Sequence, residues 1–194
     1  MKGQPREASP AAPGSPPVVC VIGKKKSGKT TTTVALVAEL TRRGHRVMTV
    51  KHGHAFDLDH EGRDSWRHVH EGGAHRVVMA SPHGFAVLGD WPGGEPAGAA
   101  ELARRYLADA DVVVVEGFKR ESLPKIEVFR RAAHERPIYG VEDLAREDWL
   151  AIATDVRDFD AHVPVFDLDD PVLAAQLADL VERRVMGRAT SARH

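Results

Sequence analysis

The stretch "VVCVIGKKKSGKTTTTVALVAELTRRG" at residues 18–44 decides the fold class, because a strand, a glycine-bounded loop and a helix follow one another in it. "VVCVI" is short, continuous and β-branched, which is typical of a strand covered on both faces. Behind the loop, Val34, Val37 and Leu40 recur at helical spacing. A second strand is predicted at 45–52, and the order strand, loop, helix, strand indicates a parallel α/β unit.

The loop completes the pattern G-x-x-x-x-G-K-[ST] with Gly23, Gly28, Lys29 and Thr30. Glycines let the backbone wrap inward so that its N–H groups point at phosphate oxygens, and the positive end of the following helix adds to the attraction. Lys29 is expected to reach the β- and γ-phosphates of a nucleotide and to act in catalysis, and the Thr30 hydroxyl to ligate Mg²⁺. A phosphate-binding loop is therefore predicted, and its other members are Lys24, Lys25, Lys26, Ser27 and Thr31.

The lysines at the variable positions of this loop carry separate expectations. The side chains of Lys25 and Lys26 are expected to point outward into solvent. Two interpretations stay open for Lys24: a solvated side chain, or one that reaches phosphates bound by a partner, as in some dimeric nucleotide-dependent proteins with this loop.

Three acidic residues are candidates for organising the metal ion and the attacking water. Glu116 ends "DVVVVE", the most apolar run of the chain, which predicts a central strand whose carboxyl end meets the ligand crevice. Asp57 and Asp59 follow the second strand, where either residue would hold a metal-bound water or position the attacking water. The alternatives are a solvated strand end for Glu116 and loop solvation for both aspartates, since turns favour Asp.

The remaining chain predicts an α/β fold with a mainly parallel sheet flanked by helices and an added β-hairpin. Strands are expected at 125–130, 150–154 and 163–166, a hairpin at 76–81 and 85–90, a short helix from about Asp64, and helices at 98–109 and 171–185. We expect one nucleotide-binding domain over 18–187, a disordered Pro- and Ala-rich tail at 1–17 and a flexible end at 188–194.

Composition excludes several classes of protein. The 194 residues carry a net charge of -1, which argues against non-specific binding to nucleic acid or to a membrane through overall charge. No apolar run is long enough to span a bilayer. The single cysteine cannot form an internal disulfide, and a reduced, cytoplasmic location is expected.

Histidines are dense in one region, which raises the hypothesis of a transition-metal site. Yet no cysteine pair and no H-E-x-x-H accompanies them, and loose clusters lack the fixed spacing of strong zinc motifs. His52 and His54, close behind the second strand, are better candidates for contacts with phosphate or substrate.

Several segments in order resemble the molybdopterin-guanine dinucleotide biosynthesis protein B (MobB) family: "VIGKKKSGKTTT", "VKHGHAFDLDHEGRDSWRH", "VVVVEGFKRESLPKIEVFR" and "LAIATD". The resemblance covers residues 18 to about 155. It implies a P-loop NTPase fold, a GTP-binding accessory protein with weak GTPase activity, and Mg²⁺ as cofactor. It also implies a homodimer that assists the GMP-transferring enzyme (MobA) acting on molybdopterin.

Carried over residue by residue, the resemblance assigns Glu116, Gly117 and Lys119 to the family's second motif and Asp57 and Asp59 to its acidic loop. The chain has "EGRDS" where the family often shows Pro-Gly-Lys-Asp-Ser, which puts a role for a proline turn there in doubt.

Guanine preference does not follow from the residues, because the base-reading pattern N-K-x-D is absent. Asp155 is our candidate, since a carboxylate accepts hydrogen bonds from guanine N1 and N2, which adenine cannot match. Two other functions stay open: a small-molecule kinase, and a metallochaperone GTPase that carries metal in the His-rich loop.

Overall fold

The computed structural model describes residues 15–53, 58–91 and 94–187. Two compact units separate in it, one formed by the described residues up to His52 and from Gly98 onward, the other by those from Gly53 to Ala97. The expected disordered tail lies outside the described residues up to position 14, and the expected flexible end at 188–194 lies outside them entirely. The described residues include no helix long and apolar enough to cross a membrane.

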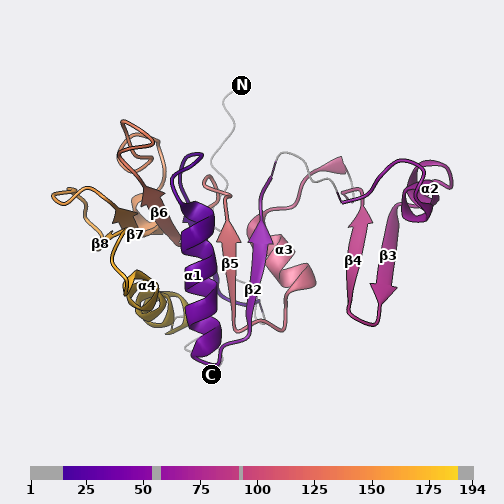
Figure 1. Cartoon of the computed structure of the whole chain (residues 1–194), viewed down its shortest axis with the longest axis horizontal. Helices are drawn as coiled ribbons and strands as arrows, with labels where there is room; N and C mark the ends of the chain where they lie inside the picture. Colours follow the sequence, from indigo (N-terminus) through magenta and orange to yellow (C-terminus); the bar gives the residue numbers. More distant parts are fainter. Residues whose placement is uncertain (1–14, 54–57, 92–93, 188–194) are drawn as a thin grey trace. The chain divides into compact units, whose positions relative to one another are not determined.

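The larger unit is built on a parallel sheet of six strands in the order β2-β5-β1-β6-β7-β8 (Figure 1). Its strands are β1 Val18–Ile22, β2 Val47–Lys51, β5 Val112–Glu116, β6 Lys125–Phe129, β7 Trp149–Thr154 and β8 Val165–Asp167. Its helices are α1 Lys29–Arg42, α3 Ala99–Tyr106 and α4 Leu173–Val181, with a 3₁₀ turn at Arg146–Asp148 and a π-helical turn at Glu182–Met186. The predicted fold class is confirmed.

The smaller unit contains helix α2 Asp64–His70 and an antiparallel hairpin of β3 Arg76–Ser81 and β4 Gly84–Gly89. The predicted hairpin is confirmed. One of its faces is apolar and exposed, because Val78 pairs with Val87 and Ala80 pairs with Phe85 in register. Side chains of directly paired residues lie on the same side of a hairpin.

The sheet is covered on both faces, as the apolar strands require. In β5, Val112 and Val114 belong to the core shared with α1 and α4, whereas Val113 and Val115 belong to the core on the side of α3. Cys20 lies in the second core, where burial raises the pKa of its thiol to about 12. The thiol is free and stays protonated at neutral pH.

Two predicted boundaries are wrong at the C-terminal end, for reasons of hydrogen bonding. The last strand begins at Val165 rather than at 163, because Pro164 has no N–H to donate and contributes only its carbonyl, which accepts from Ile152. The last helix begins at Leu173 rather than at 171, since the Asp170 carboxylate accepts the N–H of Val172 at 2.9 Å in a preceding turn.

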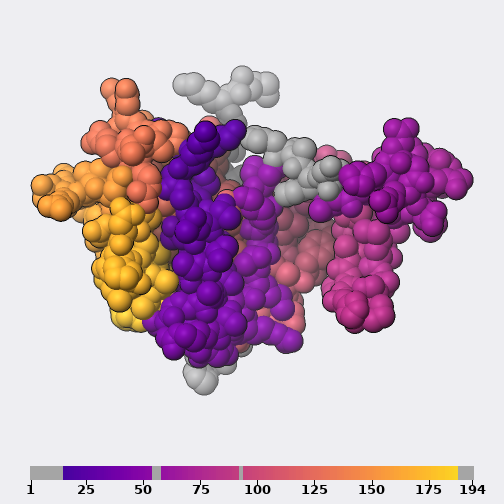
Figure 2. Space-filling view, in the orientation of Figure 1, coloured from indigo at the N-terminus to yellow at the C-terminus, as the bar shows by residue number. Residues whose placement is uncertain are grey.

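Helices α1 and α4 lie side by side on one face of the sheet, as Figure 2 shows in indigo and yellow. Arg43, just after α1, links them: its guanidinium donates to Glu39 at 2.8 Å, to Asp179 at 2.6 Å and to Glu182 at 2.7 Å. His45 adds a contact of 2.6 Å to Glu182. This polar network links α1 to α4 next to their apolar interface.

We expect the network to make stability depend on acid. Hydrogen bonds from Arg42 and Arg43 lower the pKa of Glu39 from 4.5 to about 2, so its contribution is present above pH 4.5 and is lost as the pH falls through 2. Urea unfolding at a series of pH values should therefore show that the free energy of unfolding falls as the pH is lowered from 4.5 to 2. Glu39→Gln cannot titrate and should lose that part of the dependence; identical pH profiles for the two proteins would contradict the assignment.

Candidate phosphate-binding site

The loop between β1 and α1 has the backbone that its glycines allow. Gly23 has φ +151° and Gly28, the residue before α1, has φ +99°, both in the region that favours glycine. A Cβ on Gly23 would lie 2.4 Å from the carbonyl oxygen of Val128 and 2.7 Å from Ser27 Oγ. The loop thus packs against β6 so closely that no side chain fits at its first position.

Lys29 lies across this loop. Its ammonium donates to the carbonyl oxygen of Lys24 at 2.6 Å, and the N–H of Ser27 donates to the same oxygen at 3.3 Å. The pKa of Lys29 is lowered, first by burial, and Glu116 opposes the shift. A lysine ammonium held across a glycine-bounded loop before a helix is placed to bind a phosphate chain.

Two further features of the loop fit such a ligand. The side chain of Ser27 is buried, and its Oγ has no hydrogen-bond partner within the described ranges. Buried polar atoms are normally paired, so this atom indicates a missing polar partner. In addition, the first N–H groups of α1 lack partners within the helix and face the loop. Thr31 is exposed on this first turn.

Thr30 and Glu116 meet beside the loop. The Thr30 hydroxyl donates to the two carboxylate oxygens of Glu116 at 3.0 and 3.1 Å. Glu116 ends the interior strand β5 and is buried. A hydroxyl and a carboxylate are hard oxygen donors of the kind Mg²⁺ prefers, so the two residues fit the metal predicted for them.

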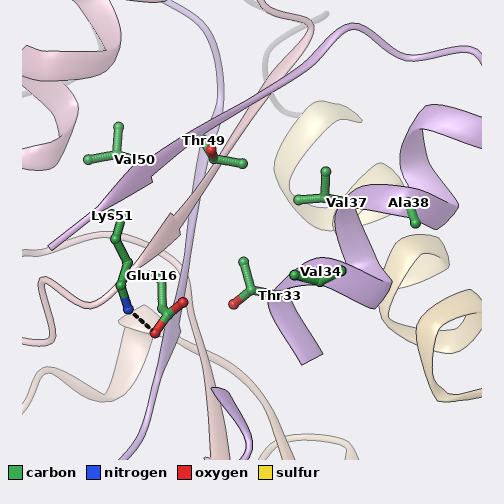
Figure 3. A pocket seen from close by; sticks show the side chains of 8 residues that line it. All are labelled: Thr33, Val34, Val37, Ala38, Thr49, Val50, Lys51 and Glu116. Atoms are coloured by element: carbon green, nitrogen blue, oxygen red, sulfur yellow. Dashed lines mark hydrogen bonds and ion pairs between the residues drawn. The ribbon is translucent and has the colours of Figure 1, made fainter. Parts of the chain in front are cut away.

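Sequence reasoning missed Lys51, the last residue of β2. It is the aligned partner of Glu116 in the neighbouring strand, and its ammonium pairs with Glu116 Oε1 (Figure 3). The signal was present in "VKHGH", since the lysine and the acid each end an apolar strand of one parallel sheet. Both residues line a cavity of about 360 Å³ between α1 and β2. Figure 3 shows their side chains next to each other among the lining residues.

The turn after Glu116 is tight. Gly117 has φ +110° and Phe118 has φ +52°, and a Cβ on Gly117 would lie 2.8 Å from His52 Cβ. The backbone N–H of His52 donates to the carbonyl of Glu116 at 3.0 Å, and its ring packs edge-on against Phe118 at 4.8 Å between centroids. His52 and Gly117 therefore lie beside Glu116.

The segment after β6 closes over the phosphate-binding loop. The Lys24 ammonium donates to the carbonyl of Arg136 at 2.7 Å, and His134 Nε2 lies 2.5 Å from the carbonyl of Lys25. In these described residues Lys24 is thus bonded to its own chain, while the side chains of Lys25 and Lys26 are exposed, as expected.

Strand β6 carries two buried charges that the sequence analysis did not single out. The Lys125 ammonium donates to the carbonyls of Glu121 and Leu123 and to Asp148, the last two at 2.9 Å. The Glu127 carboxylate accepts the backbone N–H groups of residues 138 and 139 at 2.6 and 2.8 Å. Burial raises the pKa of Glu127, against these hydrogen bonds. Each charge fixes one of the segments beside the site.

The remaining candidates have separate positions. Lys119 pairs with Glu142 at 2.7 Å. Asp155, at the end of β7, accepts the N–H of Arg131 at 2.7 Å. Asp59 belongs to the smaller unit, where its Oδ1 accepts from the N–H of His60 and from the hydroxyl of Ser65, both at 3.0 Å.

Asp57 and His54 lie outside the described residues. Within 15–53, 58–91 and 94–187, no three side chains of His, Cys, Asp or Glu gather into a site of the kind that holds a transition metal.

Comparison with known proteins places residues 18–155 within the family model "MobB: Molybdopterin guanine dinucleotide synthesis protein B". The chain is 35% identical over 140 residues to a molybdopterin-guanine dinucleotide biosynthesis adapter protein of Haemophilus influenzae, covering 71% of this chain and 74% of that protein. It is 33% identical over 168 residues to the protein of that name from Escherichia coli, covering 85% and 91%.

Solved structures agree with the fold. The crystal structure of a MobB homolog from Bacillus stearothermophilus superposes with a TM-score of 0.64 at 27% identity, covering 86% of this chain and 99% of that one. Bacillus subtilis MobB superposes with a TM-score of 0.63 at 22% identity, covering 84% and 97%, and supports the fold alone.

Proposed function

Because the chain belongs to the molybdopterin guanine dinucleotide synthesis protein B (MobB) family, we propose that it is a GTP-binding adapter with weak GTPase activity in that synthesis. One observation supports nucleotide binding. The Lys29 ammonium lies across the glycine-bounded loop, and the hydroxyl of the next residue, Thr30, donates to the buried carboxylate of Glu116. That arrangement joins a phosphate-binding cradle to a pair of metal ligands.

The proposed chemistry is electrostatic. The loop amides and Lys29 hold the phosphates and stabilise the negative charge that develops on the transferring phosphoryl group. Thr30 and Glu116 would hold Mg²⁺, which supplies further charge stabilisation when bound. A slow basal rate is expected because the first two arginines after β6 have other bonds: Arg130 pairs with Asp169 at 2.9 Å, and Arg131 donates to the carbonyl of Glu135 at 2.9 Å.

Partners follow from the same proposal. The adapter would contact the GMP-transferring enzyme (MobA) and molybdopterin in the cytoplasm, and it would act as a homodimer. The exposed apolar hairpin face of Val78, Phe85 and Val87 supports a protein contact, since such faces are costly to leave in water. Light scattering coupled to size-exclusion chromatography tests the dimer, and a monomer at all concentrations would contradict it.

Guanine preference is proposed to come from Asp155. Its Oδ1 accepts from the Arg131 N–H, and its Oδ2 lies 3.9 Å from Arg130, so acceptor capacity is left for the donors of guanine N1 and N2. In Asp155→Ala the ratio of GTP to ATP affinity should fall toward one. An unchanged ratio would contradict this role.

Calorimetric titration with GTP and with ATP, each in Mg²⁺ and in EDTA, tests the proposed function. Binding of GTP that strengthens with Mg²⁺ is expected, followed by binding of the loaded protein to the GMP-transferring enzyme and to molybdopterin. Lack of binding to either nucleotide would refute the proposal. Stoichiometric phosphoryl transfer to a second small molecule would indicate a kinase instead. Metal retained after chelation, and lost when His52 is replaced, would indicate a metallochaperone.

A further inference from the structure

The Lys51 ammonium forms an ion pair with the carboxylate that the proposed Mg²⁺ ion would need. Lys51 and Glu116 end neighbouring parallel strands and are aligned partners in their register, so their side chains leave the sheet on one face. The Lys51 ammonium pairs with Glu116 Oε1, and the same carboxylate accepts the Thr30 hydroxyl at 3.0 and 3.1 Å. Figure 3 shows the pair side by side among the residues that line the cavity. One carboxylate thus serves an ammonium group and the hydroxyl that would ligate Mg²⁺.

The two partners differ in exposure. The Glu116 side chain is 7% exposed, whereas the Lys51 side chain is 55% exposed. An ionised carboxylate that is buried without a cation is costly, so Glu116 requires a positive partner whenever no metal is bound. A long lysine side chain that reaches in from solvent can supply that partner and can leave again, because most of its own surface is already in water.

We propose that Lys51 is an internal counter-ion of Glu116 that competes with Mg²⁺. The ammonium neutralises the carboxylate in the metal-free chain and leaves it when Mg²⁺ enters with a nucleotide. This inference rests on the proposed function, because it concerns the same site. It assigns Lys51 a positioning role: the lysine holds the carboxylate beside the Thr30 hydroxyl until the metal arrives.

Charge in the surroundings supports this assignment. Lys29 lies close to both residues. Burial is the main cause that lowers its pKa, the Glu116 charge raises this pKa, and the Lys51 charge lowers it. If Mg²⁺ were held by Glu116, the Lys51 ammonium would lose its acid partner and would remain near the Lys29 ammonium. The lysine is then available for a phosphate oxygen, and the metal-free and metal-bound states use it differently.

Titration of GTP into Lys51→Met at a series of Mg²⁺ concentrations and in EDTA tests the inference. In EDTA the affinity should fall about fivefold, because one cation near the phosphates is lost. The Mg²⁺ concentration for half-maximal tightening should also fall about fivefold, because no ammonium competes for the carboxylate. Loss of a merely structural residue would lower the GTP affinity and raise the Mg²⁺ concentration that is needed. A lower affinity together with a lower Mg²⁺ requirement is therefore diagnostic of competition.

Two further variants serve as controls. Lys51→Arg keeps a cation that can pair with Glu116, so its Mg²⁺ requirement should equal or exceed that of the parent. Arg46→Met removes the same charge at the other end of the strand, where Arg46 pairs with Asp109 at 3.0 Å, and should change neither quantity. Thermal unfolding confirms that each variant is folded, and Lys51→Gln provides a second neutral variant should the methionine variant unfold.

The outcomes separate the two claims. If the parent chain binds neither GTP nor ATP under any condition, the proposed function is wrong and the inference about Lys51 is wrong with it. If the parent binds a nucleotide and both neutral variants keep or raise its Mg²⁺ requirement, Lys51 does not compete with the metal. The proposed function would then stand without this inference.

Discussion

Lys29→Ala should lower the affinity for GTP by at least about a hundredfold, since charge-assisted hydrogen bonds to phosphate contribute roughly 1.5–3 kcal/mol each. The Lys29 ammonium lies across the loop and donates to the carbonyl of Lys24 at 2.6 Å, so it is already placed at the mouth of the cradle. Nucleotide binding would exchange this backbone acceptor for phosphate oxygens. Calorimetry with GTP and Mg²⁺ measures the loss.

Arg42→Ala is the matched control for this prediction. It removes one positive charge from the same helix, but Arg42 is 72% exposed and pairs with Glu39 one turn earlier at 2.7 Å. Its effect on GTP affinity should be small, since exposed ion pairs of this kind contribute about 0.5 kcal/mol or less. Equal losses in the two variants would show that overall charge, and not the position of Lys29, governs binding.

Gly23→Ala should destabilise the fold by more than about 3 kcal/mol and abolish nucleotide binding. The methyl group would meet the backbone carbonyl of Val128 at 2.4 Å and Ser27 Oγ at 2.7 Å, and the first contact cannot be relieved by turning a side chain. Either β6 moves away from the loop or the loop opens. Both changes displace the amides that bind phosphate.

Gly44→Ala separates this overlap from backbone strain. Gly44 has φ +94°, but nothing lies within 4 Å of a Cβ placed there. Only the cost of a left-handed conformation applies, about 1–2 kcal/mol, or a few degrees in thermal midpoint. GTP affinity should not change, because Gly44 lies after the far end of α1. Urea and thermal unfolding compare the two glycines; equal costs would contradict the steric argument at Gly23.

Local patterns predicted much of the larger unit and the core of the site. The β-branched strand, the glycine-bounded loop and the periodic helix are neighbours in sequence, so their pattern specifies their contacts. Glu116 was also predicted, since an acid that ends a wholly apolar strand must lie at the strand's carboxyl end. Those parts of the site depend on short segments and on the rule that parallel strands end at one edge.

Long-range pairing explains what the sequence did not predict. The contact of Lys51 with Glu116 requires that β2 and β5, far apart in the chain, lie side by side in one register. Lys125 and Glu127 alternate with apolar residues in "KIEVF", a pattern typical of a strand with one wet face. Loops cover that face instead, and this depends on contacts which no local pattern encodes.

The two buried charges of β6, Lys125 and Glu127, each anchor an irregular segment, and they do so with opposite charge. Lys125 gathers carbonyl oxygens from the segment before it, and Glu127 gathers amide hydrogens from the segment after it. A single charged side chain thus holds each irregular segment in place, one before β6 and one after it, where no helix or strand hydrogen bonds among the described residues do so. Exchanging the charges would set a cation against amide hydrogens and an anion against carbonyls, so both segments would lose their anchors although composition and net charge were conserved.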